Sequence, residues 1–317
     1  MSSRFIWQLR QALRGDKQLH GLYMRLKRRF TAQLVGMTSK TEQDFCTRYG
    51  RDGYTGSGEV VDLGCWLGST TISLARGLKD NRAFLDPPRK IHAFDLFVWY
   101  EWMNESLAGT DLLGRYSEGD SFLEEFEERV SEYAAFIDVH EGDLAKIGWI
   151  DKPIEFLLVD AMKNWELANA IVHDFYSHLI PGKGLLMHQD FAFFLVPWIH
   201  VIKWKFRDHF EIFADVPHSA TLVFQMIEPI PSSMLGDRFS YASFSRQDLD
   251  AAYEYFLPLV SEEKRPKVAA AKVMWFLERD LISEAVEEFD SLIQGGVPVK
   301  NEMLAVKKML DTRTLMG

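Results

Sequence analysis

Short apolar runs recur through the middle of the chain, and each ends in a polar or acidic residue. Nearly continuous apolar runs of this length are typical of strands buried on both faces of a sheet. We expect an α/β fold whose strand ends carry the functional residues, because open α/β sheets bind ligands at the carboxyl ends of their strands. The runs cover residues 60–63, 90–95, 135–140, 154–159 and 184–187.

The first run continues into a glycine turn, Asp-Leu-Gly-Cys-Trp-Leu-Gly-Ser-Thr at 62–70. Gly64 and Gly68 allow a tight turn and a close ligand approach, and Ser69 and Thr70 are expected to cap the helix that follows. The turn has no P-loop lysine and no third glycine of the dinucleotide fingerprint. Asp62 would disfavour pyrophosphate and would accept a cationic ligand group. The alternative is a plain strand-to-helix connection.

Acidic residues follow the later runs at corresponding positions. Asp95 is suited to accept both hydroxyls of a ribose, and Asp143 is suited to accept an exocyclic amine. Asp160 and the pair Gln189 and Asp190 end the next two runs. A single acid at a strand end is more often a helix cap, but a series at successive strand ends indicates a ligand site.

These motifs, at 62–70, 94–97, 142–143, 159–160 and 189–191, resemble those of class I S-adenosylmethionine-dependent methyltransferases, most closely the macrocin and catechol O-methyltransferase group. The resemblance covers roughly residues 55–230. It implies a doubly wound, seven-stranded, mostly parallel Rossmann-like sheet, which segments 211–216 and 220–230 close as an antiparallel pair. It also implies S-adenosylmethionine as cofactor, bound by Asp62, Gly64, Trp66, Gly68, Ser69, Thr70, Asp95 and Asp143.

The same resemblance implies a divalent ion, usually Mg²⁺, held here by Asp160, Gln189 and Asp190. Lys163 stands where catechol-type enzymes carry a base, whereas Met162 stands where macrocin-type enzymes carry a second acid. We expect methyl transfer to a hydroxyl, with Lys163, His188 or Asp160 as the catalytic residues that handle its proton. His188 is alternatively a histidine satisfied within the core.

An aromatic segment follows the second run. Trp99, Tyr100 and Trp102 are expected to form a lid over the acceptor, and Phe191 the facing wall. The alternative is a helix that packs its tryptophans into the core. The expected acceptor is a hydroxyl of a glycosylated, polyketide-like or phenolic small molecule, as in natural-product or glycan modification.

Charge is divided unevenly along the chain, whose net charge is −10. Residues 1–30 hold eight Lys and Arg against one acid, which leaves 28 basic and 45 acidic residues elsewhere, a net charge of −17. This basic head suggests two short helices that dock on the acidic body, or a peripheral contact with an anionic membrane. Nucleic acid is not an expected partner, because the acidic body would repel phosphate.

Two cysteines, Cys46 and Cys65, exclude a disulfide framework. The sequence shows no membrane span and no signal peptide, so we expect a cytoplasmic protein. We also expect it to form a homo-oligomer.

The chain is expected to divide into a basic helical segment at 1–50, a methyltransferase domain at 51–232 and a helical region at 233–317. The helical region shows patterns at 246–260, 262–278, 281–294 and 299–311, with Ser245 as a cap. A competing hypothesis is a binding or scaffold protein of methyltransferase fold that contacts partners through this helical tail.

Overall fold

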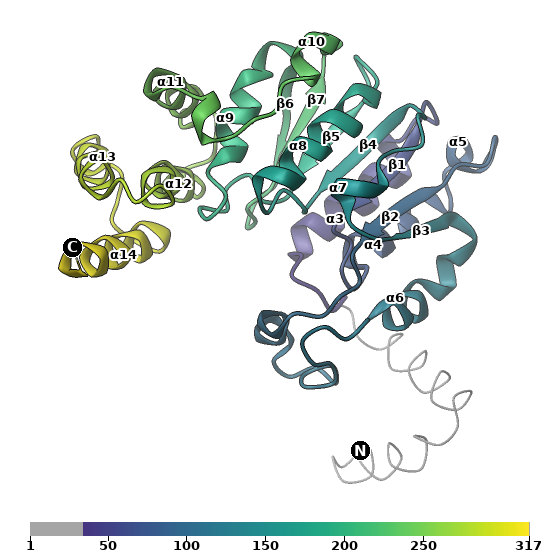
Figure 1. The fold of residues 1–317 in the computed structure, drawn as a ribbon. Coiled ribbons are helices and arrows are strands. Elements are labelled where there is room, and N and C mark those ends of the chain that lie inside the picture. The colour runs from purple at the N-terminus through teal and green to yellow at the C-terminus, as the bar shows by residue number, and fades with distance from the viewer. Residues whose placement is uncertain (1–33, 317) are drawn as a thin grey trace.

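A computed structural model describes residues 34–316 of the chain, with side chains placed up to residue 314. Seven strands form one sheet in the order β3-β2-β1-β4-β5-β7-β6 (Figure 1). β1 to β5 pair in parallel, and β7 runs antiparallel to both β5 and β6. The expected doubly wound, seven-stranded sheet is confirmed. The strands are β1 Glu59–Leu63, β2 Ile91–Asp95, β3 Ile137–Glu141, β4 Ile154–Val159, β5 Leu185–His188, β6 Phe210–Asp215 and β7 Leu222–Met226.

Helices cover both faces of the sheet. Successive strand side chains point to opposite faces, and in β1 and β4 every one of them is buried, so both faces need a cover. Val61 and Val159 belong to one core with α8, α9 and the C-terminal helices, and Val60 and Leu158 belong to the other with α3, α4 and α6. The longer helices before residue 210 are α3 Lys40–Arg48, α4 Ser69–Leu78, α6 Leu123–Val130, α8 Trp165–Asp174 and α9 Trp198–Lys205. The shorter ones are η1 Tyr49–Gly53, α5 Arg82–Leu85, η2 Glu101–Leu107, η3 Ser131–Phe136, α7 Leu144–Ile147, η4 Tyr176–His178 and η5 Arg207–His209.

The C-terminal helices continue the core of one sheet face rather than starting a separate one. α11 packs on α9, and α12 packs on α11, α13 and α14. Ser245 and Asp248 form the expected capping box at the start of α11. The later elements are α10 Ser232–Leu235, η6 Tyr241–Ser243, α11 Arg246–Phe256, α12 Arg265–Leu277, α13 Ile282–Gln294 and α14 Glu302–Met316.

An ion pair attaches this helical region to the sheet. Lys264 is buried, and its ammonium contacts the carboxylate of Asp215 at the end of β6. The backbone N–H of Ser261 donates to the other oxygen of that carboxylate at 2.8 Å. The start of α12 is therefore fixed to a strand that lies about 50 residues earlier in the chain.

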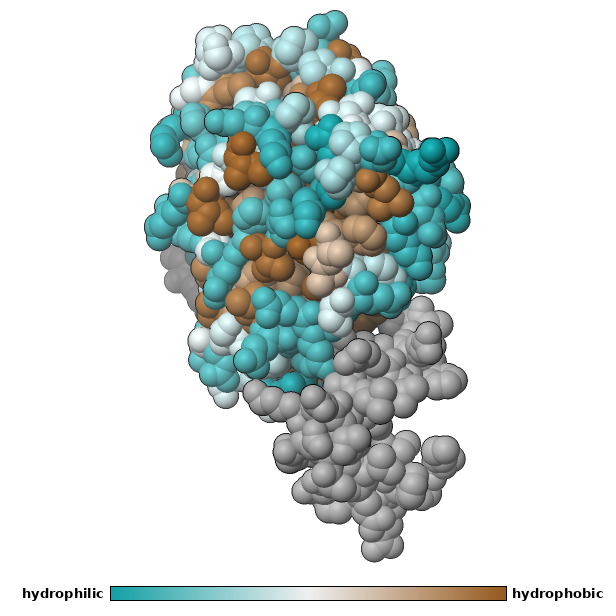
Figure 2. All heavy atoms as spheres, turned by 90° about the vertical axis from the view of Figure 1, so that its right-hand side faces the viewer, coloured by the Kyte–Doolittle hydropathy of each residue, from teal (hydrophilic) through white to brown (hydrophobic). Residues whose placement is uncertain are grey.

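The basic head, residues 1–30, lies outside the described residues. Between residues 34 and 316, no helix combines the length and the apolar character needed to cross a bilayer. Figure 2 shows the side of the molecule that lies to the right in Figure 1, where separate apolar groups are interspersed with polar ones over the coloured surface.

Candidate functional site

The turn after β1 requires both of its glycines. Gly64 has φ 84°, and a Cβ there would lie 2.7 Å from the carbonyl oxygen of Asp160 at the end of β4. Gly68 has φ 78°, and a Cβ there would lie 3.1 Å from the side chains of Phe126 and Val130. Because L side chains rarely adopt these angles, the sequence places glycine where the backbone leaves the sheet and enters α4.

The expected capping of α4 by Ser69 and Thr70 is wrong. Gly68 is the N-cap residue, and no side chain there accepts a helix N–H. The Thr70 and Thr71 hydroxyls instead each donate to one oxygen of Asp62 at 2.7 Å. The Ser69 hydroxyl pairs with that of Thr38 at 2.6 Å. The Thr70 and Thr71 hydroxyls therefore hold the carboxylate of Asp62 on β1 instead of capping α4.

Asp62 is completely buried at the end of β1, and burial raises its pKa to about 6. Its second carboxylate oxygen has no hydrogen-bond partner among the described residues. Leaving a buried carboxylate oxygen unpaired is unfavourable, so this atom lacks a donor that the described residues do not supply, and its ligand role stays a prediction.

Asp95 connects β2 to the glycine turn. One carboxylate oxygen accepts the backbone N–H of Trp66 and the other accepts that of Phe97, both at 2.9 Å. Trp66 has a positive φ of 41°, so this hydrogen bond holds a sparsely populated backbone conformation. Burial raises the pKa of Asp95, with these two backbone N–H groups opposing. The lone pairs that remain on the carboxylate are available to a ligand.

Asp143 acts as the N-cap of α7. Its carboxylate accepts the backbone N–H of Ala145 at 3.0 Å and pairs with Lys146 at 2.9 Å. The lysine lowers the pKa of this largely solvated acid. The structure thus gives Asp143 the capping role that an isolated acid at a strand end usually has, and its binding role stays a prediction.

Asp160, Lys163 and Asp190 meet where β4 and β5 end. The ammonium of Lys163 lies 2.6 Å from a carboxylate oxygen of Asp160 and also contacts Asp190. The two carboxylates together raise the pKa of Lys163 against the effect of burial, so it stays an ammonium. Burial raises the pKa of Asp160, with Lys163 opposing and Asp190 adding to the increase.

His188 is the last residue of β5, and Gln189 begins the turn that follows. His188 lies on the same face as Leu186 and is buried, and neither ring nitrogen has a partner among the described residues. Burial, with nearby Lys203, holds its pKa well below the usual range, so the ring is neutral. The side-chain oxygen of Gln189 is also buried and unpartnered in the described part of the chain.

The four aromatic residues expected around the acceptor separate into two groups. Trp99 is fully buried, with ring centroids 4.9 Å from Tyr116 and 6.4 Å from Trp66. Phe191 is fully buried on the opposite face of the sheet. Both therefore pack in the cores. Tyr100 stacks on Trp102 at 6.4 Å with a 10° interplanar angle, and Trp102 is 52% exposed.

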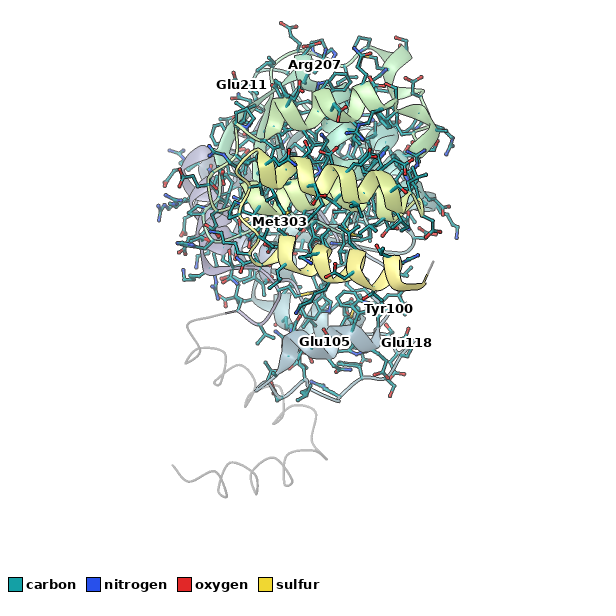
Figure 3. The ribbon with its side chains drawn as sticks, turned by 90° about the vertical axis from the view of Figure 1, so that its left-hand side faces the viewer. Tyr100, Glu105, Glu118, Arg207, Glu211 and Met303 are labelled. Atoms are coloured by element: carbon teal, nitrogen blue, oxygen red, sulfur yellow. The ribbon has the colours of Figure 1, made fainter. Side chains whose placement is uncertain are left out.

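The segment that carries these aromatics is not structureless, because Glu101–Leu107 form the 3-10 helix η2. The backbone N–H of Glu101 donates to the carboxylate of Glu118 at 2.6 Å, which closes the segment into a loop. Figure 3 shows Tyr100, Glu105 and Glu118 together at one end of the molecule. Tyr100 and Trp102 therefore reach solvent, unlike Trp99 and Phe191, and their role in acceptor binding stays a prediction.

Sequence reasoning did not identify the contribution of α3. Glu42 is buried, and its carboxylate accepts the Ser39 backbone N–H at 2.7 Å and contacts the hydroxyl of Thr221 on the loop before β7. A Cβ on Gly36 would lie 2.6 Å from the Ser69 hydroxyl, so residues before α3 cover the glycine turn closely. The Ser-x-x-Glu pattern at 39–42 is a capping-box signal for this helix.

The sequence matches no protein-family model and no curated protein. Among solved structures, the chain is similar to the O-methyltransferase NovP, with 17% identity over 62% of this chain and 84% of that one, and a TM-score of 0.47. It is also similar to the calicheamicin methyltransferase CalS11, with 16% identity, 58% and 76% coverage and a TM-score of 0.43. Human N-acetylserotonin methyltransferase in complex with S-adenosylmethionine matches at 15% identity, 46% and 34% coverage and a TM-score of 0.25.

Proposed function

We propose that this protein is an S-adenosylmethionine-dependent methyltransferase that acts on a hydroxyl of a small molecule. The observation that carries the proposal is the joining of the glycine turn to Asp95 through the Trp66 N–H, above a buried Asp62 with an unpaired oxygen. This arrangement lies at the carboxyl ends of β1 and β2, where open α/β sheets bind nucleotide-like ligands.

The residues present fit this cofactor. Asp62 offers an unpaired buried oxygen to the ammonium of the amino-acid part, and Asp95 offers its free lone pairs to the ribose hydroxyls. Gly64 and Gly68 shape the turn, because a Cβ on either would press against Asp160 or against Phe126 and Val130. When bound, S-adenosylmethionine supplies an electrophilic methyl group on its sulfonium.

The protein must then align the acceptor and remove its proton. Lys163 stays protonated between its two carboxylates, so it is suited to stabilise a developing oxyanion rather than to act as the base. Asp160 is the better proton acceptor, because burial raises its pKa towards the range of a useful base. His188 is neutral and fully buried, so we propose it as a core residue rather than as the base.

Mg²⁺ does not fit this arrangement. Asp160, Gln189 and Asp190 would offer the oxygen ligands that Mg²⁺ prefers. The ammonium of Lys163 contacts both carboxylates, however, so a divalent ion held between them would lie beside a like charge. We assign no step of the reaction to a metal ion.

The acceptor side is open to aromatic stacking. Trp102 is 52% exposed and stacks on Tyr100, which provides a flat apolar surface for a phenol or a sugar ring. We propose that these two residues form the acceptor wall, without Trp99 and Phe191. The scaffold alternative is less favoured, because it gives no role to the unpaired oxygen of Asp62.

Calorimetric titration of the full chain with S-adenosylmethionine and its demethylated product tests the proposal. We expect saturable binding of both at one site per chain. Labelled cofactor incubated with a panel of catechols and glycosylated phenols should then give a methylated product. A full chain that is folded but binds neither cofactor form would favour the scaffold alternative.

A further inference from the structure

We propose that the ammonium of Lys163 is the resident cation of the acceptor site and takes the place of the divalent ion that the sequence resemblance implies. This inference rests on the proposed function, since it concerns the acceptor side of the same site. The observation behind it is a single ammonium in contact with two carboxylates that come from two different strands.

The position of Lys163 is fixed by the end of β4 before it and by the start of α8 after it. Asp160 follows the last residue of β4, and the Lys163 N–H donates to the Ala161 carbonyl at 2.8 Å in a tight turn. Asn164 comes next and caps α8, its side-chain oxygen accepting the Leu167 N–H at 2.9 Å. Only the four residues 160–163 therefore separate the last residue of β4 from the N-cap of α8, and they hold the lysine next to the strand ends.

The opposite carboxylate is held as firmly. Asp190 follows β5 after one intervening residue, and its carbonyl accepts the Phe193 N–H at 2.9 Å. β4 and β5 are adjacent parallel strands, so Asp160 and Asp190 approach each other as a consequence of the sheet order. Two neighbouring ionised carboxylates repel each other, and the chain itself provides a cation that contacts both.

The second acid that macrocin-type enzymes carry is absent from this site. Met162 stands at the position where macrocin-type enzymes carry a second acid, and it is buried in the core with its carbonyl accepting the Trp198 indole N–H at 2.9 Å.

The lysine retains a donor for the acceptor. An ammonium carries three N–H donors, and the two carboxylates use two of them. Its side chain is 44% exposed, so the third N–H is accessible to a ligand oxygen. A hydroxyl that loses its proton in this site would meet a fixed positive charge, as it would beside a metal ion.

Binding of Mn²⁺, followed by its electron paramagnetic resonance spectrum, tests this directly in the full chain. We expect no binding by the wild type up to about 1 mM Mn²⁺, the weak end of protein sites for hard cations. Lys163→Ala leaves two carboxylates without their cation, so it should bind Mn²⁺ at least about tenfold more tightly. Lys146→Ala is the matched control, because exposed Lys146 forms the same i,i+3 pair with Asp143.

The result that overturns the proposal is a wild-type protein that binds Mn²⁺ well below 1 mM, whatever the variants do. A folded Lys163→Ala protein, as judged by its melting curve, that gains no Mn²⁺ affinity also counts against it. Calorimetry with S-adenosylmethionine on the same samples keeps the two ideas apart. A wild-type protein that does not bind S-adenosylmethionine refutes the proposed function. A wild-type protein that binds both S-adenosylmethionine and Mn²⁺ refutes only the lysine assignment.

Discussion

The carboxylate of Asp95 accepts the backbone N–H of Trp66 at 2.9 Å, and this hydrogen bond joins the end of β2 to the turn after β1. The proposed function assigns the same carboxylate to the ribose of the cofactor. On that proposal one acid shapes the turn and binds the ligand, so its removal would affect cofactor binding in two ways.

We expect Asp95→Ala to raise the dissociation constant for S-adenosylmethionine at least about tenfold. Charge-assisted hydrogen bonds contribute about 1.5–3 kcal/mol each, and the substitution removes those to the ligand. Titration calorimetry measures the change. The control is Asp138→Ala on β3, a half-exposed acid that pairs with Lys90 at 3.3 Å, which should leave the constant unaltered. Equal affinities for Asp95→Ala and wild type would exclude Asp95 from the cofactor site.

Asp62 should cost stability when it is ionised. Its pKa is about 6 in the folded protein, against about 3.9 in an unfolded chain. The folded state therefore holds the proton more tightly, and the associated stability is present below about pH 4 and lost as the pH rises through 6. The whole effect is up to about 3 kcal/mol.

Asp62→Asn removes this pH dependence. We expect the variant to have a larger free energy of unfolding in urea than the wild type at pH 8, with the difference shrinking towards pH 4.5. It should also bind S-adenosylmethionine more weakly, because the charge facing the ligand's ammonium is gone. A variant less stable than the wild type at pH 8 would show that the charged form is well accommodated in the core.

Lys264→Met should loosen the C-terminal helices. Removing one partner of a buried ion pair costs about 3–5 kcal/mol, and we expect the lower end because Asp215 is 22% exposed and keeps the Ser261 N–H. Hydrogen exchange should increase most in α11 and α12. Lys267→Met on the same helix is the control and should change little. Equal exchange in both variants would mean that the shared apolar core, not this pair, attaches the helices.

The fold was predictable because its signals are local. The apolar run at 154–159 is β4 itself, and the patterns expected at 281–294 and 246–260 correspond to α13 and α11. The turn after β1 was predictable from its glycines, and Gly64 and Gly68 both have the positive φ that such a turn requires.

The details of the site were less predictable, because they depend on contacts between distant parts of the chain. The Thr70 hydroxyl donates to Asp62, eight residues earlier, instead of capping its own helix. Glu42 reaches Thr221 across 179 positions. An aromatic cluster in sequence does not reveal which face each ring takes, so Trp99 and Trp102 could not be separated before the sheet was placed.

The last prediction concerns the basic head, whose charge of +7 opposes the −17 of the remainder. We propose that residues 1–30 contact another copy of the chain or an anionic membrane, since each basic residue near an anionic lipid surface contributes about 1 kcal/mol. Removing residues 1–30 should reduce either the number of chains in the oligomer, measured from the solution mass, or co-sedimentation with phosphatidylserine vesicles. It should leave cofactor affinity unchanged.

A full-length protein with Lys27, Arg28 and Arg29 changed to Gln separates charge from length. If the contact is electrostatic, this variant should behave like the truncated chain, and salt above about 0.5 M should weaken the wild-type contact, because screening shortens the range of surface charges. A variant that behaves like the wild type, with a contact insensitive to salt, would contradict an electrostatic contact. A truncated protein that loses cofactor binding while its mass and vesicle behaviour match the full chain would make the head part of the cofactor site.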